Sequence, residues 1–145
     1  MDITIGFVSS SLERAQAEDL RRSVLCGELH WPREVVEEKG DSAAQLALVC
    51  LGPKAIATGR LIQREGFWHL ELLAVLERFR KQGVGKRLVE ALEERALQQG
   101  ATRLRVLATE ELCAYFGKMG YLPLDGPMLE KLIKLSDGEA LPKAL

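Results

Sequence analysis

Two glycines separated by one residue, Gly83 and Gly85, lie where an apolar segment gives way to a helix-like one. Glycine lets a ligand approach the main chain because it has no Cβ. The first turn of a helix adds amides without internal partners and the positive end of the helix dipole, which together suit a phosphate. Four cationic side chains flank the pair: Arg80, Lys81, Lys86 and Arg87. The segment therefore predicts a local site for a phosphate-containing ligand.

The spacing around this turn rules out two common phosphate motifs. The P-loop pattern GxxxxGK[ST] needs a glycine where Arg80 stands and a hydroxyl where Arg87 stands, so no magnesium ligand is evident. The dinucleotide pattern GxGxxG needs a third glycine where Leu88 stands. What remains is RxxGxG, from Arg80, Gly83 and Gly85. Taken alone, it also fits an ordinary helix start with a basic, solvated face.

Three segments in order resemble the GNAT family of N-acetyltransferases. RxxGxG is similar to the family's acetyl-CoA signature [Q/R]xxGxG/A, and it soon follows the Leu-Ala-Val triplet Leu73–Val75. Tyr115–Tyr121 resembles the family's F-Y-x-K-x-G-F. More weakly, Val24–Leu29 with Pro32 after it resembles the V-F-x-x-E-Q plus proline of one subgroup. The resemblance covers roughly residues 15–125 and implies acetyl-CoA-dependent transfer to an amine.

The resemblance also implies where acetyl-CoA binds. In the family, the strand before the glycine turn and the next parallel strand splay apart, and the pantetheine arm enters between them like an added strand. These strands correspond to Leu73–Val75 and Leu104–Leu107, and the pyrophosphate would lie on the amides from Lys81 to Lys86. An amide near Leu73 or Val75 would polarise the thioester carbonyl. The residues assigned to acetyl-CoA are Leu73, Ala74, Val75, Arg80, Lys81, Gln82, Gly83, Val84, Gly85, Lys86 and Phe116.

Transfer to an amine requires that the amine lose a proton, so we expect a general base near the splayed strands. Glu71 and His69 are the candidates, because strand alternation predicts that both share a face with Leu73 and Val75. The alternative for both is a solvated strand face. Glu28, in the weaker motif, either acts as a base or lines the acceptor pocket.

The departing thiolate needs a proton, which many family members take from the Tyr of F-Y-x-K-x-G-F. That position is Phe116 here, and Tyr115 is its neighbour. Adjacent helical residues point about 100° apart, so Tyr115 is expected to replace the missing hydroxyl only if the helix is rotated. The family's Asn near the start of this helix corresponds to Thr109. The sequence therefore leaves the general acid open.

Hydrophobic periodicity predicts the elements that position these residues. Strands are expected at residues 2–8, 43–51, 55–63, 67–75, 104–107, 121–124 and 129–135, and helices at 12–30, 83–99 and 110–119. We expect a surface loop at 33–42 and a frayed tail from Ser136. The order predicts an α/β fold in which a mixed sheet combines an antiparallel meander with one splayed parallel pair and flanking helices. All of 1–145 is expected to form a single domain.

Composition narrows the function further. The 145 residues are 47% hydrophobic and carry a net charge of −1, which gives no basic footprint for nucleic acid. Three cysteines without a CxxC pair predict reduced thiols rather than a disulfide framework or a metal site: Cys26, Cys50 and Cys113. The N-terminus does not resemble a signal peptide, and no apolar stretch is long enough to span a membrane. We therefore expect a cytoplasmic protein without membrane contact.

Three functions remain open at this point. The first is an N-acetyltransferase that moves the acetyl group of acetyl-CoA to a small-molecule or peptide amine by direct attack in a ternary complex, without a metal. The second is a non-catalytic acyl-CoA-binding sensor or docking module of the same fold, motivated by Phe116. The third, a nucleotide-phosphate binder, is disfavoured by the missing Ser or Thr. A homodimer is compatible with the resemblance, and the acceptor and the preferred acyl length are not identified.

Overall fold

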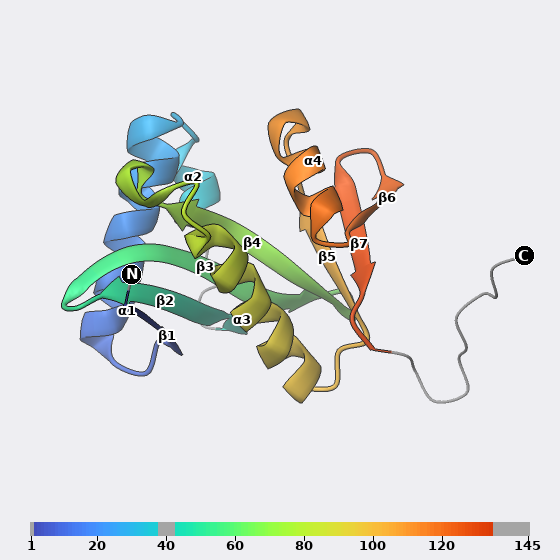
Figure 1. Cartoon of the computed structure of the whole chain (residues 1–145), viewed down its shortest axis with the longest axis horizontal. Coiled ribbons are helices and arrows are strands. Elements are labelled where there is room, and N and C mark those ends of the chain that lie inside the picture. Colours follow the sequence, from blue (N-terminus) through green and yellow to red (C-terminus); the bar gives the residue numbers. More distant parts are fainter. Residues whose placement is uncertain (1, 38–42, 135–145) are drawn as a thin grey trace, which may run out of the picture.

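The structure is a computed structural model that describes residues 2–37 and 43–134. Its strands form one sheet in the order β1-β2-β3-β4-β5-β7-β6 (Figure 1). The strands are β1 (Ile3–Phe7), β2 (Gln45–Leu51), β3 (Lys54–Arg64), β4 (Phe67–Val75), β5 (Arg103–Leu107), β6 (Leu122–Asp125) and β7 (Met128–Leu132). The helical elements are α1 (Ser11–Arg21), the π-helical η1 (Arg22–Glu28), α2 (Arg33–Val36), the 3₁₀ turn η3 (Glu77–Phe79), α3 (Val84–Gln98) and α4 (Glu110–Lys118).

The sheet is mixed, as the element order predicts. Strands β1 to β4 pair antiparallel in chain order, and β7 pairs antiparallel with both β5 and β6. Only β4 and β5 pair in parallel among the described strands, and α3 connects them. The predicted meander, the crossover through the glycine turn and the flanking helices are therefore confirmed.

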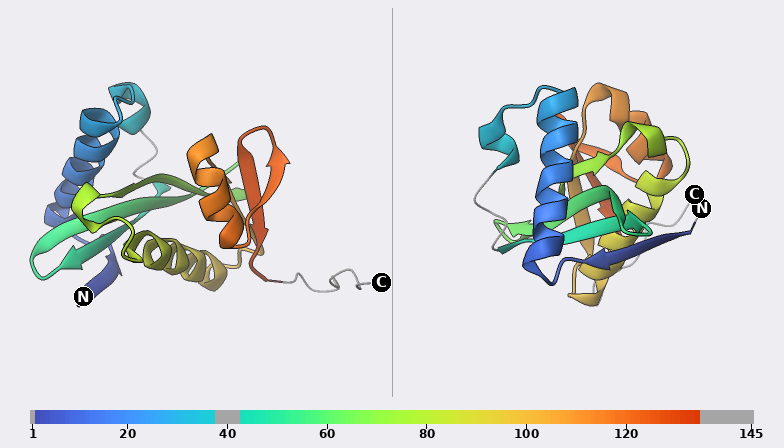
Figure 2. Two further views of the ribbon diagram at one scale, coloured as in Figure 1. Left: turned by 45° about the horizontal axis from the view of Figure 1, so that its top comes forward. Right: turned by 90° about the vertical axis from the view of Figure 1, so that its left-hand side faces the viewer.

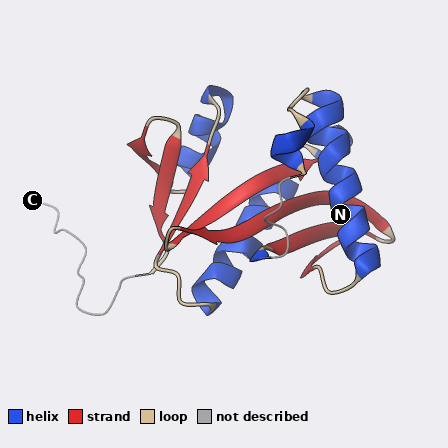
Figure 3. Ribbon diagram, turned by 180° about the vertical axis from the view of Figure 1, so that it is seen from behind, coloured by secondary structure: helices blue, strands red, loops and turns tan. Residues whose placement is uncertain are grey.

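Helices cover both faces of the sheet (Figures 2 and 3). On one face α3 buries Val84, Leu88, Leu92 and Ala96, which recur every four residues and are each at most 1% exposed. Full burial of each such leucine contributes about 1.5–3 kcal/mol. On the other face α1 buries Ala17 and Leu20. The sheet is therefore fixed between two helices, and the turn that begins α3 is held on a rigid base.

Gly59 in β3 lets α3 approach the sheet closely. A Cβ at this position would lie 2.6 Å from Leu73 Cδ2 and 3.0 Å from Leu92 Cδ1. Because the missing Cβ would point toward α3, the neighbouring side chains of Thr58 and Arg60 point to the α1 face. This orientation decides where the charged residues of β3 and β4 meet.

Two expectations for the N-terminal third are wrong. The predicted single helix to residue 30 changes character at Arg22, where a wider π-helical turn lets the adjacent Val24 and Leu25 both become buried. The predicted loop at 33–42 begins with the helical turn α2, because Val36 is fully buried against the cluster around Val24. Residues 38–42 and the predicted tail lie outside the described residues. No helix in the described ranges is long and apolar enough to cross a bilayer.

Candidate functional site

Strands β4 and β5 stay together for only a short distance. Their pairing joins Trp68 to Leu104, His69 to Arg105 and Leu70 to Val106. Beyond Leu70 the strand β4 continues to Val75 without a β5 partner, and the two strands diverge (Figure 1). The predicted splayed pair is therefore confirmed. On the β5 side, the main chain of Glu71–Val75 has no strand partner and can accept an extended ligand, except at the Val75 carbonyl, which accepts a hydrogen bond from Arg80 Nε.

The glycine turn lies directly beyond the open end of β4. Gly83 is the N-cap of α3 with φ 85°, and the first helical hydrogen bond runs from the Arg87 amide to its carbonyl, at 3.1 Å. A Cβ on Gly83 would meet no atom within 4 Å, so the space beside these amides is open. The first turn carries no acidic side chain to neutralise the helix dipole. The turn therefore fits the phosphate ligand that the sequence predicts.

Gly85, in contrast, lies beneath a side chain from α4. A Cβ at Gly85 would lie 2.9 Å from Tyr115 Oη and 3.8 Å from Val75 Cγ2. The phenol of Tyr115 thus reaches across to the start of α3 and the end of β4. Burial, followed by the charge of Glu90, raises the pKa of Tyr115. Its hydroxyl is therefore a neutral proton donor at neutral pH.

Phe116 occupies a different environment from its neighbour. It is 2% exposed and packs edge-on against Tyr121, with ring centroids 5.5 Å apart. The sequence assigns Phe116 to the acetyl-CoA site and expects Tyr115 to miss the position of the hydroxyl. In the structure Phe116 packs in the core and the Tyr115 hydroxyl lies over the turn, so of the two side chains Tyr115 is the one that faces the candidate site.

A β-bulge in β4 overturns the predicted sharing of a face. Arg60 pairs with Glu71 but Thr58 pairs with Ala74, so the bulge lies between these two pairs, and Leu72 within it has φ 50°. Leu73 and Val75 consequently pack in the α3-side core, whereas Glu71 meets Arg60 on the α1 face. Simple alternation fails here because the extra residue reverses the order of the faces.

Glu71 is held by two arginines. Arg60 Nη2 donates to its carboxylate at 2.5 Å, and Arg64 donates through Nε at 2.7 Å and through Nη2 at 3.1 Å. Burial favours the neutral acid, but the hydrogen bonds from Arg64 and Arg60 outweigh it and lower the pKa of Glu71. Arg60 itself is 0% exposed, so this carboxylate balances a buried charge.

His69 lies two residues before Glu71, between Ile62 of β3 and Arg105 of β5. Burial is the main cause that lowers the pKa of His69, although the charge of Glu71 opposes it. The imidazole is therefore neutral at neutral pH and able to accept a proton. Both other candidate bases, Glu71 and Glu28, accept hydrogen bonds from arginines. Among the described residues, no arginine donates to the His69 ring.

Glu28 and Arg80 form a bidentate ion pair. Arg80 Nη1 and Nη2 each donate to one carboxylate oxygen of Glu28 at 2.6 Å, and Arg80 Nε donates to the Val75 carbonyl at 2.9 Å. The hydrogen bond from Arg80 lowers the pKa of Glu28. The guanidinium predicted to face the phosphate is thus engaged by the protein.

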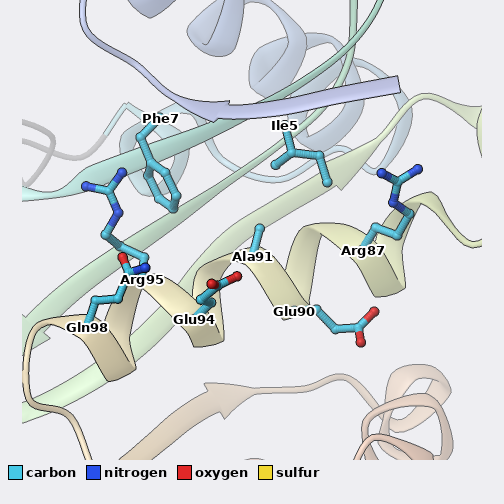
Figure 4. A pocket seen from close by; sticks show the side chains of 8 residues that line it. All are labelled: Ile5, Phe7, Arg87, Glu90, Ala91, Glu94, Arg95 and Gln98. Carbon is cyan, nitrogen blue, oxygen red and sulfur yellow. The ribbon is translucent and has the colours of Figure 1, made fainter. Parts of the chain in front are cut away.

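The other cations of the turn are exposed. Lys81 and Lys86 are exposed at the turn, whereas Arg87 lines an open groove between α3 and β1 (Figure 4). This groove, about 580 Å³, lies against Ile5 and Phe7 and carries charges of both signs from α3, including Glu90 and Arg95. It lies apart from the diverging strands, and its lining residues include no His, Cys, Ser or Tyr.

Sequence reasoning overlooked Arg60 and Arg64. The signal was available in the sequence, because Glu65-Gly66, between the strands expected at 55–63 and 67–75, is typical of a two-residue hairpin turn. Such a turn sets Arg64 opposite Phe67 and Arg60 opposite Glu71. The bulge follows this paired stretch and so does not disturb it. Within the described ranges no group of three or more His, Cys, Asp or Glu could hold a metal ion.

Comparison with known proteins matches this architecture. The model of the Acetyltransferase (GNAT) family matches residues 11–121. An uncharacterized N-acetyltransferase of Bacillus subtilis strain 168, YjcF, is 28% identical over 102 residues, which cover 70% of this chain and 73% of that protein.

Solved structures share the fold. A Lactobacillus plantarum protein named as a candidate N-acetyltransferase superposes with a TM-score of 0.84 at 24% identity, over 90% of this chain and 98% of that one. N-acetylglutamate synthase from Neisseria gonorrhoeae, solved with coenzyme A and N-acetyl-glutamate, gives a TM-score of 0.73 at 19% identity, over 93% of this chain and 36% of its own. With the family model spanning most of the sequence and the splayed strands in place, the chain belongs to the acetyltransferase (GNAT) family.

Proposed function

We propose that this protein is an N-acetyltransferase that transfers the acetyl group of acetyl-CoA to a primary amine of a small molecule or peptide, by direct attack in a ternary complex. The observation that carries the proposal is the divergence of β4 from β5 beyond Leu70, which leads onto the open turn at Gly83. An extended ligand with a diphosphate at one end has the shape that this arrangement would accept.

In this proposal the glycine turn and the end of β4 bind acetyl-CoA. Amides of the first turn of α3 bind the diphosphate, and the free edge of Glu71–Val75 binds the pantetheine arm. The same fold is seen with coenzyme A in the Neisseria synthase. Most contacts come from the main chain, so the glycines matter more here than the side chains of Lys81 and Lys86. Arg80 contributes through the loop that it braces rather than through a free guanidinium.

His69 is the general base in this proposal, accepting the amine proton directly or through one water. Its lowered pKa leaves it neutral, whereas Glu71 is occupied by Arg60 and Arg64. The amine nitrogen attacks the thioester carbon, the carbon–sulfur bond breaks, and Tyr115 donates its hydroxyl proton to the departing thiolate. Support for that role is that a Cβ on Gly85 would lie 2.9 Å from Tyr115 Oη and 3.8 Å from Val75 Cγ2, so the hydroxyl lies where the glycine turn meets the end of β4.

The sensor alternative draws support from the same contacts. Both acidic candidates are tied to arginines, Glu71 to Arg60 and Glu28 to Arg80, which is an unusual use of a catalytic carboxylate. In that case the protein would bind acyl-CoA without turnover. A single domain over 1–145 and a cytoplasmic location remain part of either proposal.

Two measurements test the function. Calorimetric titration with coenzyme A should give saturable binding, and release of free thiol from acetyl-CoA should rise above background for at least one member of an amine panel. The panel should contain polyamines, amino acids, aminoglycosides and peptides with free N-termini. Coenzyme A binding without thiol release for any amine class would favour the sensor alternative. Absence of coenzyme A binding would rule out both the acetyltransferase and the sensor.

A further inference from the structure

Three distant segments meet at the guanidinium of Arg80. Glu28 ends η1, Val75 ends β4, and Arg80 begins the loop that leads to Gly83. Arg80 donates from Nε to the Val75 carbonyl and from both terminal nitrogens to the Glu28 carboxylate, across 52 residues of sequence. A planar fork bound at three points has little freedom to rotate. The contact therefore ties the end of η1 to the free end of β4.

The loop held in this way has a conformation that needs outside support. Lys81, next to Arg80, has φ 61°, a left-handed conformation that a residue with a Cβ rarely adopts. Gly83 follows with φ 85°. The other hydrogen bonds of the loop among the described residues are local: the Arg80 amide donates to the Glu77 carbonyl, and Gln82 Nε2 donates to the Arg78 carbonyl. Glu28 is the distant partner of this strained segment.

We propose that Glu28 is a positioning residue for the coenzyme A loop, which it holds through Arg80 in the conformation that presents the amides of α3 to the diphosphate. This inference rests on the proposed function, because its ligand is coenzyme A. It assigns Glu28 a role other than the general base or acceptor contact that the sequence predicts, since both carboxylate oxygens are engaged by Arg80.

The direction in which coenzyme A affinity changes on substitution of Glu28 distinguishes a positioning role from simple charge repulsion. Coenzyme A is a polyanion, so removal of a nearby negative charge should tighten its binding if Coulomb repulsion were the main effect. Loss of a positioning contact should weaken binding instead, because the loop must then be ordered at the expense of binding free energy. A substitution of Glu28 by the neutral isostere therefore gives opposite results under the two accounts.

The experiment is calorimetric titration of coenzyme A into the wild-type protein and four variants. Glu28→Gln should weaken binding about tenfold, and Arg80→Lys, which keeps the charge but loses the fork, should weaken it by a similar factor. The double variant should be little weaker than either single one, because both changes break the same contact. Glu77→Gln is the matched control: it removes an exposed negative charge that acts on the Arg80 guanidinium only through space, and it keeps the main-chain hydrogen bond from the Arg80 amide to the Glu77 carbonyl.

Kinetics and folding complete the test. In Glu28→Gln the KM for acetyl-CoA should rise while kcat at saturation stays within about twofold, the pattern of lost binding without lost chemistry. Thermal unfolding should confirm that each variant is folded, and Arg80→Lys tests the contact from its other side should Glu28→Gln fail to fold. Unchanged or tighter coenzyme A binding in Glu28→Gln or Arg80→Lys would overturn the positioning role while the proposed function stands. If the wild type does not bind coenzyme A, the proposed function fails first and this inference fails with it.

Discussion

The two halves of β4 are built for different tasks. From Phe67 to Leu70 the strand lies between β3 and β5, with hydrogen-bonded neighbours on both sides. From Glu71 onward β5 is absent, a bulge interrupts the pairing with β3, and Leu72 takes φ 50°. In the first half the main chain pairs with strands on both sides, whereas in the second half the edge that faces β5 has no strand partner. Glu71, at the junction, anchors the open half with a buried ion pair.

This contrast predicts that loss of the Glu71 ion pair alters folding, whereas changes at the glycine turn or at Tyr115 alter binding or turnover. His69 lies in the paired half, so a role in turnover there would come from its side chain alone. Each prediction below can break the contrast if the effect appears in the wrong measurement. They run from the largest expected effect to the smallest.

Glu71→Ala should have the largest effect, on stability. It removes a carboxylate to which the fully buried Arg60 donates, and the loss of such a buried ion-pair partner costs about 3–5 kcal/mol of unfolding free energy. Chemical denaturation measures the loss. The control is Glu130→Ala. Glu130 also lies in the sheet, but its partners Arg105 and Arg103 are 23% and 43% exposed and can be solvated, so the loss there should be about 1 kcal/mol. Equal losses in the two variants would mean that Arg60 does not depend on Glu71.

Tyr115→Phe should reduce kcat about 100-fold, or about 2.7 kcal/mol, because the departing thiolate loses its proton donor. Binding of coenzyme A should change little, since the ring is kept. Tyr121→Phe removes a hydroxyl that donates to Glu93 at 2.8 Å and serves as the control, with an effect on stability and not on kcat. A Tyr115→Phe enzyme with wild-type turnover would assign the proton to another group.

Gly83→Ala should weaken coenzyme A binding about tenfold, or about 1.4 kcal/mol. At φ 85° the new Cβ is strained, and it projects into the space beside the amides of the turn. Titration calorimetry measures the change. Gly66→Ala offers the same strain at φ 83° in the β3–β4 turn, also with open space around the Cβ, and should leave binding intact. A shared loss would indicate a global effect.

The smallest effect concerns pH. The pKa of His69 is lowered, so the folded protein binds fewer protons there than the unfolded chain, and the associated stability declines as pH falls from about 6.5 toward the folded pKa. In kcat/KM, the acid limb should lie below pH 6.5 if His69 is the base. His69→Asn should abolish this limb and His30→Asn should keep it. A limb that survives in His69→Asn would return the role to Glu71.

Much of the fold could be predicted from the sequence, because local patterns determine it. The four-residue spacing of Val84, Leu88, Leu92 and Ala96 sets one helix face, and Glu65-Gly66 sets a hairpin and its register. The glycine turn predicts a phosphate site, because tolerance of positive φ and the lack of a Cβ are properties of glycine itself. These features depend on neighbours in the chain and therefore survive without a structure.

The tertiary structure decided the details of the site. The bulge at Leu72 comes from a mismatch between β3 and β4 around Gly59, so alternation could not show that Glu71 and Leu73 face opposite ways. The contact between Glu28 and Arg80 joins residues that local patterns cannot relate. Because Phe116 packs in the core, the adjacent Tyr115 points toward Gly85 at the start of α3. Sequence thus determined the turn and the elements around it, whereas packing between distant elements determined which side chains meet there.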